Sequence, residues 1–302
     1  MRTRRDAPGL SGKSVVVVGA TSGIGRATAL RAAGGGAAVV LFARRSDALA
    51  ALVERIRGNG GRAHAVSGDV ARPGDLERLA AEAEAAFGPI DVWITNAGVG
   101  SIGLFWEVPI DDHARVVATN LEGAMRGAHT ALRRFVPRGS GVLVHTASVE
   151  SVVPLAYQAS YAATKAGLLS LTRSLRHELR LAGAGGVSVS AVLPWAVRTP
   201  FWRHAGNHAG RALRLPLMDE PELIADAVLR AAVAPRERVA VGWKARASLL
   251  AYRLAPRATA RAAADLSHAR LLQGAPSPPS SGAVHETMRD AATAAEEPRS
   301  RR

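Results

Sequence analysis

The chain has 302 residues, of which 48% are hydrophobic and 21% are charged. This balance supplies enough apolar side chains for a sizeable core and excludes a chain that is disordered throughout. The sequence contains no cysteine, which excludes disulfides, thiolate metal sites and cysteine nucleophiles and agrees with the reducing cytoplasm where we expect the protein.

The formal net charge is +14. Such a charge is typical of proteins that bind nucleic acid or an anionic membrane surface. The basic residues are scattered, however, and no dense block with interleaved aromatic residues is present. We therefore predict a solvated basic surface and no nucleic-acid partner. The apolar runs, such as Ala37–Ala43, are too short to span a bilayer.

The first predicted element is a β-branched strand, Val15–Val18, which leads into Gly19-Ala20-Thr21-Ser22-Gly23-Ile24-Gly25 and then into a helix, Arg26–Ala33. In a strand, turn and helix of this kind, glycines let a pyrophosphate approach the backbone. The helix N-terminus then presents free amides to the phosphates. The pattern predicts a dinucleotide-binding turn, and the alternative is an ordinary tight turn that needs glycine.

The second predicted strand, Ala37–Ala43, is followed by Arg44 and Arg45. A dinucleotide fold that prefers NAD usually has an acid here to hold the ribose hydroxyls, whereas guanidinium groups suit a 2′-phosphate. We therefore predict NADP(H) in preference to NAD(H). Ser46 is predicted to cap the next helix, with Asp47 in its first turn. The alternative is that Asp47 is the ribose acid.

Small or polar residues follow the next two predicted strands. Arg62–Ser67 is followed by Gly68, Asp69 and Val70, and Ile90–Thr95 is followed by Asn96, Ala97 and Gly98, with a helix between them at Asp75–Phe87. The ends of these strands lie on the carboxyl edge of a parallel sheet, where ligands bind.

The alternation of helix and strand continues to residue 242. Helices are predicted at Asp111–Arg126, Gln158–Leu181 and 220–234, and strands at Gly141–Thr146, Val187–Leu193 and Arg238–Gly242. This pattern predicts an α/β fold with one doubly wound parallel sheet, in a single domain over residues 13–243. Asn120, inside the first of these helices, indicates a bend or a polar partner because asparagine is mildly unfavourable there.

Tyr161 and Lys165 lie four residues apart and therefore share one face of the helix Gln158–Leu181. A neighbouring ammonium favours the phenolate, so we expect Lys165 to lower the pKa of Tyr161. A tyrosine tuned in this way can give or take a proton near neutral pH. The pair alone is weak support for catalysis, because the same spacing is common on surface helices.

The two ends of the chain differ from the domain in composition. Residues 1–12 are predicted to form a flexible arm, and residues 274–302, rich in Pro, Ser, Ala and Glu, a disordered tail. Residues 244–273 are predicted to form a basic amphipathic helical extension, broken at Pro256, that packs on the domain or on a second subunit. The alternative for this extension is peripheral contact with a membrane surface or a protein partner.

The motifs Gly19–Gly25, Asn96-Ala97-Gly98, Asn120, Ser148 and Tyr161 with Lys165 together resemble the short-chain dehydrogenase/reductase family, in its compact single-domain branch. Ser148 precedes Tyr161 by thirteen residues, which is the spacing that this family uses. The resemblance covers roughly Lys13–Gly242 and implies a Rossmann fold. It also implies an NADP-dependent oxidoreductase that acts on a carbonyl or a secondary alcohol. We further expect a homodimer or homotetramer.

The resemblance assigns roles residue by residue. Ser148 would stabilise the substrate oxygen, Tyr161 would transfer the proton, and Lys165 would tune Tyr161 and bind the cofactor ribose. Asn120 would complete this catalytic tetrad by holding a water that relays protons to Lys165. The implied cofactor-binding residues are Gly19, Thr21, Ser22, Gly23, Ile24, Gly25, Arg44, Arg45, Asp69, Val70, Asn96, Ala97, Gly98, Tyr161, Lys165, Pro194 and Thr199. No metal site is predicted.

The sequence departs from the family pattern at two positions. Thr95 stands where asparagine is common, and its hydroxyl is still expected to hydrogen-bond. Trp195 stands where glycine is common, and it would either reshape the substrate pocket or cover the C-terminal helices. Five aromatic residues predict an apolar pocket for a hydrophobic carbonyl substrate, and the alternative for them is packing in the core: Trp106, Tyr157, Trp195, Phe201 and Trp202. The alternative function is a catalytically silent NADP-binding scaffold or sensor on the same fold.

Overall fold

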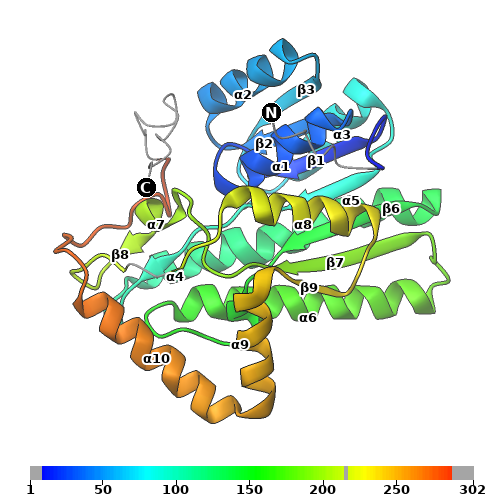
Figure 1. The fold of residues 1–302 in the computed structure, drawn as a ribbon. Helices are drawn as coiled ribbons and strands as arrows, with labels where there is room; N and C mark the ends of the chain where they lie inside the picture. The colour runs from blue at the N-terminus through cyan, green and yellow to red at the C-terminus, as the bar shows by residue number, and fades with distance from the viewer. Residues whose placement is uncertain (1–8, 214–216, 288–302) are drawn as a thin grey trace, which may run out of the picture.

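A parallel sheet of seven strands forms the centre of the molecule (Figure 1). The computed structural model describes residues 9–213 and 217–287. The strands stand in the order β3-β2-β1-β4-β6-β7-β9. Their bounds are β1 Ser14–Val18, β2 Ala38–Ala43, β3 Arg62–Ser67, β4 Val92–Thr95, β6 Gly141–Thr146, β7 Val187–Leu193 and β9 Arg238–Ala240. The predicted doubly wound α/β fold is confirmed.

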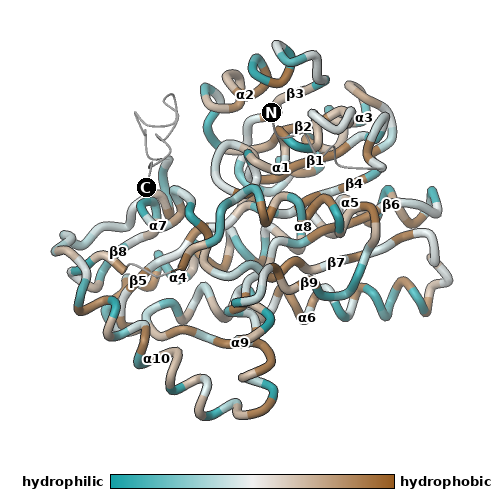
Figure 2. Tube along the Cα trace, in the orientation of Figure 1, coloured by the Kyte–Doolittle hydropathy of each residue, from teal (hydrophilic) through white to brown (hydrophobic). Residues whose placement is uncertain are grey.

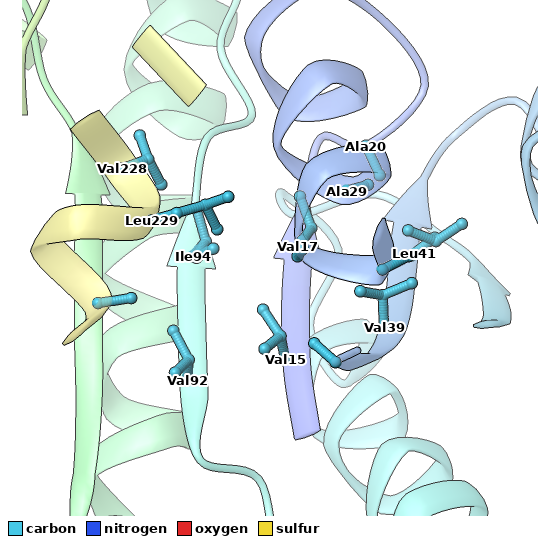
Figure 3. Packing of buried hydrophobic residues seen from close by; sticks show 14 of the residues in the cluster. Val15, Val17, Ala20, Ala29, Val39, Leu41, Val92, Ile94, Val228 and Leu229 are labelled. Carbon is cyan, nitrogen blue, oxygen red and sulfur yellow. The ribbon is translucent and has the colours of Figure 1, made fainter. Parts of the chain in front are cut away.

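Helices cover both faces of the sheet because successive side chains of each strand point to opposite faces. Val15 and Val17 of β1 pack with α1 Gly23–Gly34, α2 Ser46–Gly58 and α8 Pro221–Val233 (Figure 3). Val16 and Val18 pack on the other side with α3 Asp75–Phe87, α5 Gly123–Arg138 and α6 Ala159–Leu181. Each valine or leucine buried in this way contributes about 1.5–3 kcal/mol. The central strands are correspondingly the most hydrophobic part of the chain (Figure 2).

The predicted helix Asp111–Arg126 is part of a longer, interrupted helix. It begins as α4 Ile110–Val117, widens into a π-helix at Ala118–Glu122, and continues as α5 to Arg138. A π-helical turn inside an α-helix inserts one extra residue per turn and often marks a functional site. Asn120 lies in this turn and is 1% exposed.

One capping prediction is wrong by a residue. Ser46 is the first residue of α2 and not its cap, because Arg45 supplies the extended N-cap residue, with φ −88° and ψ 102°. No side chain caps this helix. Asp47 lies in the first turn as predicted, where a negative charge is favourable.

Two helices follow the sheet where the basic extension was expected. They are α9 Gly242–Leu254 and α10 Pro256–Leu272, and Pro256 occupies the first position of α10 (Figure 1). Ala245 of α9 packs against Val149 and Val153, which lie beyond the end of β6. The helical pair therefore covers the carboxyl edge of the sheet on its α6 side.

Residues 274–287 form an ordered segment, here called the C-terminal strap, so the predicted disorder is wrong for this part of the tail. The strap runs from α10 back past β8 Gly206–Asn207 to α7 Phe201–His204 (Figure 1). The Asn207 amide donates to the Ser280 carbonyl at 2.6 Å, and the Ala283 amide donates to the His204 carbonyl at 2.7 Å. Backbone partners on β8 and α7, together with the buried side chains of Ala283 and Val284, thus hold the strap on the domain. Residues 288–302 lie outside the described residues.

The N-terminal prediction needs a similar correction. Leu10 is 2% exposed and belongs to the core cluster that also contains Val15. The Gly12 amide donates to the Gly36 carbonyl at 3.0 Å. Residues 9–12 are therefore packed against the domain and do not form a flexible arm, while residues 1–8 lie outside the described residues.

Candidate active site

A cavity of about 620 Å³ lies at the carboxyl edge of the sheet. In the sheet, β1 lies between β2 and β4, and the strand order reverses at this point. The cavity lies at this reversal, which is where doubly wound sheets bind ligands. Most of the predicted site residues line it: Gly19, Thr21, Ser22, Gly23, Ile24, Arg44, Arg45, Asp69, Val70, Asn96, Ala97, Gly98, Ser148, Tyr161, Lys165, Pro194 and Thr199. Gly25 and Asn120 are not among the lining residues.

The turn Gly19–Gly25 needs glycine because its backbone lies very close to neighbouring backbone. Gly19 has φ +84°, and a Cβ at this position would lie 2.7 Å from the backbone of Ala97. A Cβ on Gly25 would lie 2.0 Å from the Gly19 carbonyl oxygen. Gly25 therefore serves the packing of α1 against the turn. Gly19 and Gly23 line the cavity, and a Cβ on Gly23 would lie 2.8 Å from the Thr199 side chain.

Arg44 and Arg45 lie at one end of the cavity. The Arg44 guanidinium donates to the carbonyls of Ala283 at 2.8 Å and His285 at 3.1 Å, both in the C-terminal strap. Burial lowers the pKa of Arg44, an effect that Asp69 partly offsets. Arg45 donates to the Thr21 hydroxyl at 3.4 Å. The two arginines thus reach the cavity, and Arg44 also anchors the strap.

Asp69 is fixed beside them. Its carboxylate accepts from the Ala71 amide at 3.0 Å and forms an ion pair with Arg115. Burial acts to raise the pKa of Asp69, but the Ala71 amide and Arg115 hold it below its ordinary value. Asp69 is therefore a fixed anion at this end of the cavity.

Asn120 supports the cavity wall from behind. Its Oδ1 accepts from the Val99 amide at 2.8 Å, and its Nδ2 donates to the Val99 carbonyl at 2.8 Å. Nδ2 also lies 3.3 Å from the Thr164 hydroxyl. The side chain thus fixes the loop after β4 instead of reaching into the cavity.

Ser148, Tyr161 and Lys165 meet at the middle of the cavity. Ser148 follows β6, Tyr161 projects from α6, and the Ser148 hydroxyl lies close enough to the phenol to lower the pKa of Tyr161. The Lys165 Nζ lies 5.5 Å from the centroid of the Tyr161 ring and donates to the Thr146 carbonyl at 2.8 Å. The three side chains that the sequence predicted to act together are brought together by the turn after β6 and one face of α6.

The prediction that Lys165 lowers the pKa of Tyr161 is wrong, because the pKa of Tyr161 is raised. Burial raises the pKa of Tyr161 above its ordinary value, the Glu150 carboxyl raises it further, and the Ser148 hydrogen bond lowers it in part. Burial also lowers the pKa of Lys165 from 10.5 to about 8. Burial is therefore the main influence on the pKa of Tyr161, because loss of hydration disfavours the charged phenolate.

Sequence reasoning missed Glu150, which lies two residues after Ser148 and lines the same cavity. The residue is 8% exposed, and burial raises the pKa of its carboxyl from 4.5 to about 8, against the opposing effect of Lys165. An acid between the apolar residues Val149 and Val152 was the signal that could have identified it.

Three of the five aromatic residues line the cavity, Trp106 does not, and Tyr157 follows the alternative of packing, against the cluster that contains Ile102 and Leu271. Trp195, Phe201 and Trp202 line the cavity, and the Phe201 ring lies 5.4 Å from that of Tyr161. Trp106 is 78% exposed and does not line the cavity. The Tyr157 hydroxyl instead hydrogen-bonds His268 of α10 at 2.5 Å.

Both departures from the family pattern are resolved. Trp195 lines the cavity and packs against the cluster of Val149, Val153 and Ala245, on which Leu249 and Tyr252 of α9 also pack. Thr95 does not behave as expected, because its buried hydroxyl has no hydrogen-bond partner among the described residues. The side chain points from β4 toward Gly127 of α5, where a Cβ would lie 3.6 Å from the hydroxyl oxygen.

The Glu150→Gln variant should change how stability depends on pH. Because the folded-state pKa of about 8 exceeds the ordinary value of 4.5, the folded protein keeps a proton that the unfolded chain loses. The free energy of unfolding of the wild type should therefore fall, relative to Glu150→Gln, as pH rises from about 4.5 to about 8. Urea unfolding of both proteins across this range measures the difference. Parallel curves would contradict the burial of a neutral acid.

In the described part of the chain, no helix has the length and apolar character needed to cross a membrane. The same residues contain no group of three or more His, Asp or Glu side chains arranged to hold a metal ion.

Comparison with known proteins gives concordant matches. Residues 13–209 match the family model described as short chain dehydrogenase. An uncharacterized oxidoreductase, YxnA of Bacillus subtilis, is 33% identical over 86% of this chain and 74% of its own length. The L-rhamnose 1-dehydrogenase (NAD(P)(+)) of a Sphingomonas species is 38% identical over 63% of this chain and 74% of its own.

A solved structure matches most of the chain. A short chain dehydrogenase/reductase from Burkholderia phymatum in complex with NAD superposes with a TM-score of 0.74 and 26% identity. The match covers 89% of this chain and 98% of that one. It thus extends past residue 209, where the family model ends.

Proposed function

Because this chain belongs to the short-chain dehydrogenase family and is an oxidoreductase of alcohols or carbonyls, we propose that it uses NADP(H) with Tyr161 as the proton donor. We propose further that its substrate is a hydrophobic carbonyl compound. The observation that carries the proposal is the meeting of Ser148, Tyr161 and Lys165 beside a glycine-lined cavity.

The lining residues suit a nicotinamide dinucleotide. Gly19 and Gly23 pack so closely on Ala97 and Thr199 that a Cβ would clash, and they line the cavity together with the N-terminus of α1, whose free amides suit a pyrophosphate. Arg44 and Arg45 supply guanidinium donors where a 2′-phosphate would lie, and no acid takes their place at the end of β2. The Sphingomonas relative is named for both cofactors, so the preference for NADP(H) rests on these two arginines.

The bound nicotinamide would supply hydride transfer. In this chain, the Ser148 hydroxyl would donate to the substrate oxygen and stabilise its developing negative charge. The Tyr161 hydroxyl would give its proton to the same oxygen. Lys165 would hold the cofactor ribose, while Asn120 keeps the loop at Val99 in place.

The protonation of Tyr161 supports carbonyl reduction as the favoured direction. Burial raises the pKa of Tyr161, so the phenol keeps its proton throughout the neutral range. Reduction needs a proton donor, and alcohol oxidation needs the phenolate as a base. The walls beyond Tyr161 are mostly apolar, with Val153, Leu155 and Trp195 among them, which supports a hydrophobic substrate.

Incubation of the protein with NADPH and a panel of aliphatic, aromatic and cyclic ketones tests the proposal. We expect the absorbance of reduced nicotinamide to fall with at least one hydrophobic ketone, and more slowly with NADH than with NADPH. Tight NADPH binding without turnover of any ketone would instead support the silent scaffold or sensor. That alternative is weaker because it leaves the contact among Ser148, Tyr161 and Lys165 without a use.

The Arg44→Ala variant should lose affinity for NADPH selectively. Hydrogen bonds to a charged group are worth about 1.5–3 kcal/mol, so NADPH affinity should fall about 10- to 100-fold. NADH affinity should change little, since NADH has no 2′-phosphate. Titration of protein fluorescence with each cofactor measures both values.

Comparing NADPH with NADH also separates a phosphate contact of Arg44 from its second role, which is to anchor the C-terminal strap. Loss of the bonds to Ala283 and His285 affects NADPH and NADH alike, whereas loss of a phosphate contact affects NADPH alone. Arg55→Ala, an exposed arginine of α2 outside the cavity, is the matched control and should leave both affinities unchanged. Equal losses for the two cofactors in Arg44→Ala would refute the phosphate contact.

For assembly and location, we propose a homodimer or homotetramer in the cytoplasm. Three large side chains of α9 are well exposed, Trp243 at 70%, Leu250 at 56% and Leu254 at 75%, and they would be covered by a second subunit. Light scattering of the purified protein tests the assembly, and a monomeric mass would refute it.

A further inference from the structure

The C-terminal strap joins two walls of the cavity through one residue. The Ala283 amide donates to the His204 carbonyl of α7 at 2.7 Å, and the Ala283 carbonyl accepts from the Arg44 guanidinium at 2.8 Å. His204, Arg44 and Ala283 all line the cavity, as does Thr287 further along the strap. The strap is therefore itself a wall of the cavity, at the end where Arg44 lies.

This end of the cavity is where the proposed function places the adenosine half of a nicotinamide dinucleotide. The helix α7 lies on the side of the reacting groups, because the ring of Phe201 is 5.4 Å from that of Tyr161. A dinucleotide that extends from Arg44 toward Tyr161 would therefore have the strap along part of its length. Segments placed in this way close over a ligand and control the rate at which it leaves.

A buried carboxylate on α4 holds the strap in this position. The His285 Nε2 of the strap lies 2.8 Å from Asp112 Oδ1, and the His208 Nε2 lies 2.8 Å from Asp112 Oδ2. Burial acts to raise the pKa of Asp112, but His208, His285 and the Ser281 hydroxyl hold it below its ordinary value. Asp112 is 1% exposed, so it is a fixed acceptor for the strap.

The part of the strap that lines the cavity is attached by few backbone contacts. Before this part, Ser280 exchanges two backbone hydrogen bonds with β8. Beyond Ser280, and within the described residues, Ala283 forms the one backbone–backbone hydrogen bond from the strap to the rest of the domain. The side chains of Arg44, Arg115 and Asp112 supply the other polar attachments. Such a segment can open locally while the sheet stays folded.

We propose that the C-terminal strap is a lid that retains the bound dinucleotide, and that His285 is the positioning residue that latches this lid to Asp112. With the latch closed, Ala283 and Thr287 complete the cavity wall. The inference rests on the proposed binding of a nicotinamide cofactor in this cavity. It does not depend on the direction of the reaction or on a preference for NADP(H), so the lid should act on NADPH and NADH alike.

Cofactor release from His285→Ala tests the lid without turnover. The His285 side chain is 42% exposed and does not line the cavity, whereas Arg44 lines it and Arg115 pairs with Asp69. Protein loaded with NADPH or NADH is mixed with excess oxidised cofactor, and the change in nicotinamide fluorescence gives the release rate. Loss of a hydrogen bond to a carboxylate should shift the lid toward its open state, so both release rates should rise about 10-fold.

Amide hydrogen exchange of the same proteins reports whether the latch has opened. The Ala283 amide should exchange faster in His285→Ala, while the strands of the sheet exchange as in the wild type. His177→Ala removes an exposed histidine of α6 that lies outside the cavity. This variant is the matched control and should match the wild type in both measurements.

Two results would overturn the inference while leaving the proposed function intact. If the strap exchanges faster in His285→Ala but the cofactors leave at the wild-type rate, the strap is only structural. If the strap exchanges as slowly as in the wild type, His285 does not latch it. If neither cofactor binds the wild type, the proposed function fails and the lid fails with it. Faster release from a protein that reduces no ketone would support the lid and contradict only the reductase activity.

Discussion

The Tyr161→Phe variant is expected to lose carbonyl reduction while it still binds NADPH. The substitution removes one oxygen atom, the group that would give a proton to the substrate. General acid catalysis by a positioned side chain contributes about 10²- to 10⁴-fold, so kcat should fall by that factor. The ring contact with Phe201 and the helix α6 are retained, so the fold should be unaffected. Turnover of a ketone accepted by the wild type, followed through nicotinamide absorbance, measures the loss.

Tyr157→Phe is the matched control for this experiment. Tyr157 lies four residues before Tyr161, and its hydroxyl contacts His268 outside the cavity. Loss of the Tyr157 hydroxyl should leave kcat nearly unchanged and should weaken only the packing of α10 at His268. If Tyr161→Phe retains wild-type turnover, or if Tyr157→Phe loses turnover to the same extent, Tyr161 is not the proton donor.

The Ser148→Ala variant should show the second largest effect. Removal of one preorganised donor to a developing oxyanion costs about 10²- to 10³-fold in kcat. Ser148 also caps the short helix Val149–Ser151, which is worth about 1 kcal/mol, so a small loss of stability is expected as well. Steady-state kinetics and thermal unfolding of the same preparation report the two effects separately.

Ser151→Ala distinguishes the chemical effect of Ser148 from the structural one. The Ser151 hydroxyl accepts from the Ser148 amide at 3.3 Å and forms the other half of the same cap, but it does not line the cavity. This variant should lose similar stability and keep its turnover. Equal losses of turnover in the two variants would show that Ser148 acts only through the cap.

The sheet and the cofactor turn could be predicted because local sequence determines them. The β-branched run at Val15–Val18 is completely buried on both faces, and the glycines after it occupy positions where a Cβ would clash. Ser148, Tyr161 and Lys165 could be located through the resemblance to the family, and the end of β6 and the first turns of α6 bring them together. In these cases, residues that are close in sequence determine the local structure.

Other features depend on contacts that a single sequence does not reveal. The π-helical turn at Asn120 is stabilised by the loop at Val99, twenty-one residues away in sequence. The C-terminal strap is ordered by partners at His204 and Asn207, although its composition is typical of disorder. The raised pKa of Tyr161 follows from burial, which the spacing of Tyr161 and Lys165 does not report.

The most direct measurement uses NADPH that carries deuterium at the transferred position of the nicotinamide ring. The wild type should move the deuterium to the carbinol carbon of the alcohol formed from an accepted ketone, and mass spectrometry of that alcohol detects it. Tyr161→Phe should form almost no labelled alcohol while it binds the labelled NADPH as tightly as the wild type. An unlabelled alcohol from the wild type, or full labelling by Tyr161→Phe, would contradict the account.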